Sequence, residues 1–155
     1  MLVRVAGTHE AQAITDVINA AFRRAESFFI ERDRIDADKV QSLLRTGEFL
    51  VSEVAGIITG CVYVEMKAGR SYLGLLAVSP EAQKSGIGSK LMTAAEDHCR
   101  ERGSRFMDIQ IVNLRQELPE FYHQRGYVET GIAPFTAGLN PKLACHFVKM
   151  SKALI

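Results

Sequence analysis

The most informative segment of the chain is Leu75-Leu76-Ala77-Val78-Ser79-Pro80-Glu81-Ala82-Gln83-Lys84-Ser85-Gly86-Ile87-Gly88-Ser89-Lys90. Its first residues belong to an apolar run, residues 71–78, that is typical of a strand buried on both faces. Two glycines then precede a helical pattern. The first N–H groups of a helix are unpaired and carry a partial positive charge, so glycines there let a phosphate approach closely. The segment therefore predicts a strand, a turn and a helix that begins at a phosphate site.

Other readings of the two glycines are tested by spacing. The two glycines could instead merely permit a tight turn from strand to helix. A dinucleotide fingerprint needs a third glycine where this chain has Leu91, and the GxxxxGK[ST] loop of nucleoside triphosphate sites is also not matched. The spacing thus argues against both kinds of nucleotide site.

The segments before residue 71 predict alternating strands and helices. A short strand covers residues 3–5, and Thr8 is expected to cap a helix with Ile14, Val17, Ile18 and Ala21 on one face. A second helix is expected over residues 38–45 and is stopped by Gly47. Strands over residues 49–54 and 57–66 then meet at a hairpin turn, and a further turn leads to the strand at 71–78.

The second half continues in the same way. A helix is expected over residues 87–102 with Gly103 as its stop, then a strand over 106–112 that lies parallel to the strand at 71–78. A short helix over 118–124 precedes closing strands at 127–132 and 143–150. We find no linker or internal repeat, so residues 1–155 are predicted to form one domain of the α/β (α+β) class.

Composition excludes several function classes. The net charge is +1 and the charges are interleaved, which argues against nucleic acid as a partner. No run approaches membrane-spanning length and no secretory signal is recognisable, so a cytoplasmic location without a membrane partner is expected. Three dispersed cysteines and four dispersed histidines show no metal-ligand spacing, so we expect no metal.

Two motifs together resemble those of a known family. Gln83-Lys84-Ser85-Gly86-Ile87-Gly88 is similar to the pyrophosphate-binding motif Q/R-x-x-G-x-G/A of the GNAT N-acetyltransferase superfamily, and residues 76–80 look like the strand before it. Downstream, residues 113–127 are similar to the segment of that family that ends in FY-x-x-x-GY/F. The resemblance is strong over roughly residues 50–128.

The resemblance implies a fold and a set of cofactor contacts. The fold would be a mixed, mostly antiparallel sheet of six to seven strands, flanked by about four helices, with splayed central strands that admit the pantetheine of acetyl-CoA. The implied cofactor-binding residues are Leu76, Ala77, Val78, Gln83, Lys84, Ser85, Gly86, Ile87, Gly88, Ser89 and Asn113. Tyr122 would lie near the thioester sulfur and act as the general acid, although it could instead be a helix aromatic packed on the core.

The general base is the open point in the sequence. Residues 72–78 contain no acidic side chain, although family members often use a glutamate on a central strand. Glu65, Asp108 and His146 are the candidates that remain, and each could equally be an ordinary strand residue. The segment with Phe28, Phe29, Arg32 and Arg34 either walls the acceptor pocket or forms a plain amphipathic helix.

The resemblance implies an N-acetyltransferase that transfers an acetyl group from acetyl-CoA to the amine of a small molecule or peptide by direct attack in a ternary complex. A covalent route through Cys61 or Cys145 is disfavoured, because neither lies in the motifs. One alternative is a catalytically silent acyl-CoA-binding regulatory module, and another is a structural domain without cofactor. A monomer or a homodimer is expected, with the last strand as an exposed edge.

Overall fold

The computed structural model describes residues 1–136 and 138–155. In this part of the chain, one sheet contains seven strands: β1 (Leu2–Val5), β2 (Glu48–Val54), β3 (Ile57–Lys67), β4 (Arg70–Val78), β5 (Phe106–Val112), β6 (Val128–Pro134) and β7 (His146–Ala153). The helices are α1 (Ala11–Glu26), α2 (Ala37–Thr46), α3 (Ile87–Glu101) and α4 (Leu118–Gln124), with short 3-10 turns η1 (Thr8–Glu10) and η2 (Pro80–Ala82). None of the described helices combines the length and the apolar character needed to cross a bilayer.

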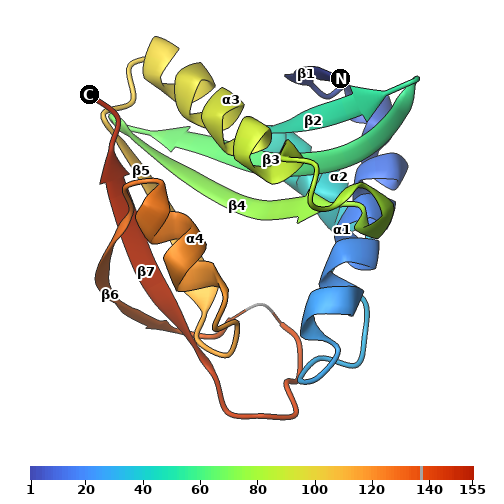
Figure 1. Cartoon of the computed structure of the whole chain (residues 1–155), viewed down its shortest axis with the longest axis vertical. Helices are drawn as coiled ribbons and strands as arrows, with labels where there is room; N and C mark the ends of the chain where they lie inside the picture. The colour runs from blue at the N-terminus through green and yellow to red at the C-terminus, as the bar shows by residue number, and fades with distance from the viewer. Residues whose placement is uncertain (137) are drawn as a thin grey trace.

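The sheet order is β1-β2-β3-β4-β5-β7-β6, and among the described strands only the β4–β5 pair is parallel. Helices α3 and α4 cover one face of the sheet, and α1 and α2 cover the other (Figure 1). The mixed, mostly antiparallel sheet of six to seven strands with about four helices is therefore confirmed. The β4-α3-β5 unit has the parallel crossover that the sequence predicts.

The centre of the sheet is splayed. Strands β4 and β5 pair only through Arg70 with Phe106, Ser71 with Met107 and Tyr72 with Asp108, and they then diverge (Figure 1). Beyond Tyr72, β4 is bonded to β3 alone. The expectation that residues 71–78 are buried on both faces is therefore wrong for the second half of the strand. Leu75 and Leu76 are only half-buried there, because no neighbouring strand covers them.

A β-bulge lies in β4 at the point of divergence. Cys61 of β3 faces Ala77, whereas Tyr63 faces Gly74, so β4 carries an extra residue in this interval. Leu75 takes up the extra length with a positive φ of 52°, which is uncommon for a leucine. A one-residue shift moves later side chains to the opposite face of the sheet. The alternation of side chains between the two faces of the sheet is therefore shifted by one residue between Leu73 and Ala77. These two side chains pack in the cores on opposite faces.

Two expected features differ clearly from the structure, whereas the other element bounds agree within two residues. Thr8 does not cap the first helix: it begins the turn η1, and the carboxylate of Glu10 accepts a hydrogen bond from the N–H of Gly7 (2.9 Å). The closing strand is His146–Ala153 instead of 143–150. It also lies inside the sheet, between β5 and β6, so the expectation that the last strand is an exposed edge is wrong. The edge strands of the described sheet are β1 and β6.

A buried ionic cluster joins α3 to the C-terminal half of the sheet. Glu96, 4% exposed, accepts hydrogen bonds from the Tyr127 hydroxyl (2.8 Å) and from Lys152 Nζ (2.9 Å). Burial, and then the charge of Glu96, raises the pKa of Tyr127. Removing one partner of a buried ion pair leaves the other charge without compensation. The cluster therefore holds the two halves of the fold together through Glu96.

We expect Glu96→Ala to lower the free energy of unfolding by about 2–3 kcal/mol, because Lys152 and the Tyr127 hydroxyl would lose their acceptor. Urea denaturation measures this change as a lower midpoint. The matched control is Glu101→Ala, an exposed glutamate on the same helix, which should change the stability by less than about 0.5 kcal/mol. Equal midpoints for the two variants would contradict a stabilising role for the Glu96 cluster.

Candidate active site

A pocket of about 720 Å³ opens where β4 and β5 diverge. Its walls come from β4, β5, α1, α4 and the loop before α3. A second pocket of about 770 Å³ adjoins it. The two share the residues Arg34, Tyr72, Leu75, Gln110 and Phe147. We call these two adjoining pockets the hollow, and each has the volume of a small-ligand site.

The loop before α3 presents backbone donors at one end of this hollow. Gly86 precedes the helix in the left-handed conformation, with φ of 80°, and Lys84 also has a positive φ of 70°. The first helical hydrogen bond runs from Lys90 N–H to the Gly86 carbonyl (3.1 Å), and within the described chain the amides of residues 84–89 donate no hydrogen bond. Gln83 Nε2 fixes the loop by donating to the Val78 carbonyl (3.1 Å). Such a helix start is suited to an anion such as a phosphate.

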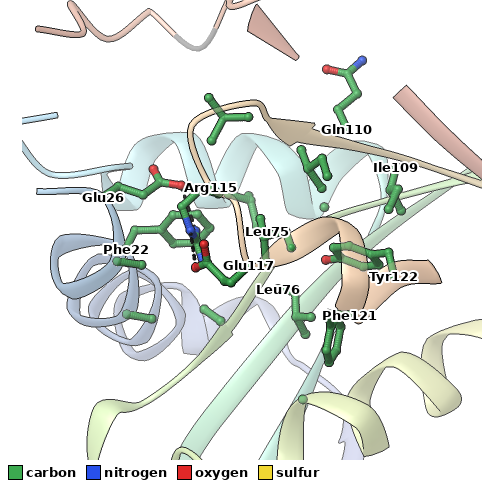
Figure 2. A pocket seen from close by; sticks show the side chains of 18 of the residues that line it. Phe22, Glu26, Leu75, Leu76, Ile109, Gln110, Arg115, Glu117, Phe121 and Tyr122 are labelled. Carbon is green, nitrogen blue, oxygen red and sulfur yellow. Dashed lines mark hydrogen bonds and ion pairs between the residues drawn. The ribbon is translucent and has the colours of Figure 1, made fainter. Parts of the chain in front are cut away.

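The free edge of β4 forms a second wall of the first pocket. Since β4 is paired with β5 only through Tyr72, the later residues Leu73–Val78 leave one edge without a strand partner. An unpaired edge offers N–H and C=O groups that an extended ligand with amide bonds can use. The side chains of Leu75 and Leu76 line the same pocket (Figure 2).

Tyr122 of α4 lies on the side of the pocket opposite Glu26 (Figure 2). Its ring packs edge-on against Phe121 and Tyr127, with centroid distances of 5.1 and 5.7 Å. Burial raises the pKa of Tyr122 to about 12, so its hydroxyl keeps its proton at neutral pH. No described residue forms a hydrogen bond with that hydroxyl. The group can therefore donate its proton to a ligand in the pocket.

An ionic cluster stands across the pocket from Tyr122. Arg115 donates through Nη1 to Glu26 (3.0 Å) and through Nε to Glu117 (2.9 Å) (Figure 2). Glu26 is 6% exposed, and burial raises its pKa even though the Arg115 guanidinium opposes the shift. A carboxylate with a raised pKa at a pocket wall has the properties of a general base. Sequence reasoning missed this cluster because its two glutamates are far apart in the chain.

The structure brings part of the predicted set into the pocket. Lining it are Leu76, Ala77, Val78, Gln83, Lys84, Gly88 and Tyr122. Outside both linings are Ser85, Gly86, Ile87, Ser89, Asn113, Glu65, Asp108 and His146. The first four of these belong to the loop and helix start next to the pocket.

The expected cofactor contact Asn113 and the base candidate His146 are bound to each other. Asn113 Oδ1 accepts from the His146 N–H (2.8 Å), and the Asn113 N–H donates to the His146 carbonyl (3.0 Å). These bonds continue the β5–β7 pairing past the end of β5. The Asn113 amide therefore has a structural partner here, and both residues lie outside the two pocket linings.

Glu65 and Asp108 are also engaged elsewhere. Asp108 receives two hydrogen bonds from Arg70 (2.8 and 2.6 Å), and this guanidinium lowers the pKa of the carboxyl group. Glu65 accepts from the Tyr63 hydroxyl (2.9 Å). Burial acts to raise the pKa of Glu65, but the hydrogen bonds from Tyr63 and Lys67 outweigh it and lower the pKa. Both carboxylates are thus weaker proton acceptors than Glu26.

Comparison with known proteins decides the family. Residues 12–154 match the family described as "Acetyltransferase (GNAT) domain". The chain belongs to the GNAT acetyltransferase family. Proteins of this family are acetyl-CoA-dependent N-acetyltransferases. The hollow between β4 and β5 is the candidate active site of this chain. Among the described residues, no group of three or more His, Cys, Asp or Glu side chains gathers as a metal site.

Relatives of this GNAT protein act on different acceptors. The chain is 26% identical over 146 residues to an L-methionine sulfoximine/L-methionine sulfone acetyltransferase of Salmonella typhimurium strain LT2, covering 86% of this chain and 84% of the relative. A putative acetyltransferase, yncA, of Salmonella typhimurium, solved with acetyl-CoA, shares 23% identity and a TM-score of 0.76 over 100% and 94% of the two chains. A ribosomal-protein-alanine N-acetyltransferase of Brucella melitensis shares 19% identity and a TM-score of 0.78 over 99% of each chain. The structural matches show a shared fold.

Proposed function

We propose that this GNAT protein acetylates the amine of a small molecule or peptide with acetyl-CoA, by direct attack of the amine in a ternary complex. The observation that carries the proposal is the protonated Tyr122 hydroxyl in a pocket bounded by a free strand edge and a helix start. The acceptors named for the Salmonella and Brucella relatives are amino acid derivatives and a protein alanine. They support an acceptor of amino acid or peptide type.

The residues around the pocket fit acetyl-CoA. The amides of residues 84–89 would bind the pyrophosphate, with Lys84 adding positive charge. The free edge at Leu76, Ala77 and Val78 would pair with the amides of pantetheine. Acetyl-CoA supplies an activated acetyl group and a thiol leaving group. No metal enters the proposal.

Two features of the site would assist the transfer itself. The N–H groups of the β4 edge can hydrogen-bond the negative charge that develops on the thioester carbonyl oxygen. Tyr122 would then donate its proton to the departing sulfur as the carbon–sulfur bond breaks and the nitrogen–carbon bond forms. Its raised pKa keeps the proton available until the sulfur needs it.

Glu26 is the group that we propose to receive the proton of the attacking amine, directly or through water. It lines the same pocket as Tyr122, and its raised pKa favours proton uptake. Glu65, Asp108 and His146, which the sequence offered for this role, lie outside both pocket linings. Arg115 would position the Glu26 carboxylate through their hydrogen bond.

The cysteines support direct attack over a covalent route. Cys61 is fully buried, and burial raises the pKa of its thiol to about 12, so little thiolate forms at neutral pH. Cys145 lies outside both pocket linings, and burial raises its pKa also. Neither thiol is placed to accept the acetyl group from the proposed thioester position.

The test is to incubate the purified protein with acetyl-CoA and a panel of amines, and to follow thiol release and the acetylated product. The proposal expects release that depends on both the protein and an amine. Calorimetric binding of coenzyme A without any release would favour the catalytically silent binding module. No binding heat at all would overturn both and favour a structural domain.

Acid pH should inhibit the enzyme through Glu26. Because burial raises the Glu26 pKa, kcat/KM should fall on acidification at a higher pH than an ordinary glutamate would produce. Glu26→Gln should lower kcat by about 100-fold and remove this acid limb. A pH profile of initial rates measures both effects.

The matched control is Glu117→Gln, which removes the other carboxylate bonded to Arg115. It should keep the acid limb and most of the rate, because its side chain is largely exposed to solvent. If the acid limb persisted unchanged in Glu26→Gln, a group other than Glu26 would be responsible for it.

A further inference from the structure

The second pocket carries an excess of positive charge. Its lining includes the cations Arg32, Arg34 and Lys39 and the acids Asp33 and Asp36. Both acids already have partners: Asp33 pairs with Arg23, and Asp36 Oδ1 accepts from the Lys39 N–H (2.8 Å) as the cap of α2. The cations therefore face the pocket without an equal number of free carboxylates.

Arg34 is the cation at the junction of the two pockets, since it lines both. Its guanidinium carbon lies 5.5 Å from the centroid of the Phe22 ring. Within residues 1–136 and 138–155, Arg34 forms no ion pair and its guanidinium donates no hydrogen bond. The face over Phe22 is thus covered, while the planar N–H donors are free for a ligand.

Other partly buried arginines of this protein are held by carboxylates. Arg4 is bonded to Glu10 and Glu53, and Arg115 to Glu26 and Glu117. Arg34 has no such partner in the described chain, although burial lowers its pKa, which shows that its charge is poorly solvated. A buried charge of this kind is best compensated by an anion.

The nearest acid does not meet this need. Glu26 interacts electrostatically with Arg34, but the two form no hydrogen bond or ion pair, and Oε2 of Glu26 accepts from Arg115 instead (3.0 Å). Glu26 instead gives the hollow a negative group next to the positive Arg34. This pair of opposite charges matches a ligand that carries an ammonium group and a carboxylate on neighbouring atoms.

We propose that Arg34 binds the carboxylate of the acceptor, and that the acceptor is an α-amino acid or a close amino carboxylate. The inference rests on the proposed acetyl transfer and names the class of amine. A guanidinium recognises a carboxylate through two parallel hydrogen bonds. Arg32 and Lys39 raise the positive potential around it and disfavour polycationic amines.

The rest of the second pocket suits the side chain of such an acceptor. Tyr63, Tyr72, Leu139 and Phe147 give it aromatic and apolar walls. The Tyr63 hydroxyl is already bonded to Thr46 and Glu65 (2.9 Å each), so its ring rather than its hydroxyl is available. An uncharged side chain of medium size is therefore the best fit.

The first experiment compares acceptors that differ at the carboxylate. The twenty standard L-amino acids, their C-terminal amides and a spermidine sample are each assayed with acetyl-CoA by thiol release. At least one free amino acid should exceed its amide by about 10- to 100-fold in kcat/KM, and spermidine should be poor. Equal use of acid and amide, or a preference for spermidine, would overturn the proposal.

Variants of Arg34 then test whether this residue binds the carboxylate. Arg34→Gln should raise KM for the preferred amino acid by about 10- to 100-fold and should raise KM for its amide far less, while Arg34→Lys should restore part of the preference. Arg45→Gln is the control, because Arg45 is an exposed arginine of α2 that lies outside both pocket linings. Retained preference for the free acid in Arg34→Gln would also overturn the proposal.

A binding readout separates this proposal from the proposed function. Thermal unfolding is recorded with each amino acid and each amide at saturating coenzyme A. The proposal expects Tm to rise with an amino acid for the wild type and to stay unchanged for Arg34→Gln. A selective rise without thiol release would reject acetyl transfer and keep the carboxylate site, whereas release with amides and no selective rise would reject the site alone. Neither release nor a rise would reject both.

Discussion

Replacing Tyr122 by phenylalanine is expected to lower kcat by about 100-fold while the affinity for coenzyme A stays unchanged. The ring would keep its edge-on contacts with Phe121 and Tyr127, so the pocket would keep its shape. Only the proton donor for the departing sulfur would be lost. Stopped-time assays of thiol release and calorimetry with coenzyme A measure the two quantities separately.

Tyr127→Phe is the matched control for this change. Its hydroxyl is bonded to Glu96 (2.8 Å) on the far side of the same aromatic cluster and lies outside both pocket linings. That variant should lose stability and keep its kcat. Because the pKa of Tyr122 is raised to about 12, the wild type should also keep its rate through mildly alkaline pH. An unimpaired Tyr122→Phe enzyme would remove the general acid from the mechanism.

The second large effect is expected at the start of α3. Gly86→Val should weaken coenzyme A binding by about 100-fold or more, which corresponds to about 3 kcal/mol. Gly86 has φ of 80°, a conformation that a β-branched residue strongly disfavours, so the backbone must rearrange and its N–H donors would turn away from the phosphate. Calorimetric titration with coenzyme A measures the loss.

Gly56→Val provides the control for backbone strain. Gly56 has nearly the same φ, 79°, and an added Cβ meets no atom within 4 Å at either glycine. It lies in the β2–β3 turn, outside both pocket linings. The two variants should lose similar stability, and only Gly86→Val should lose coenzyme A affinity. Equal affinities in both variants would contradict a pyrophosphate site at this loop.

The fold was predictable where local signals are strong. The β4-α3-β5 unit follows from an apolar run, a glycine pair and a four-residue apolar spacing that ends at Gly103. The last strand was placed three residues early because the chain before His146 has no periodicity to fix its start. Its position between β5 and β6 depends on long-range pairing, which a single sequence does not encode in any local pattern.

The site was predictable in part for the same reason. The loop before α3 and Tyr122 each belong to a short sequence motif, so their places in the chain can be predicted from the sequence. Glu26 and Arg115 are separated by 89 positions, and their contact depends on how α1 meets the segment after β5. The bulge at Leu75 is also invisible beforehand, because a leucine with positive φ contradicts its own preference.

The short β4–β5 ladder has a consequence for how the molecule responds to its ligand. Three residue pairs link the four-stranded half of the sheet to the three-stranded half. A molecule seated between β4 and β5 and bonded to both would add hydrogen bonds that the diverging strands do not make to each other. Amide hydrogen exchange along residues 73–78 should then slow sharply on saturation with coenzyme A.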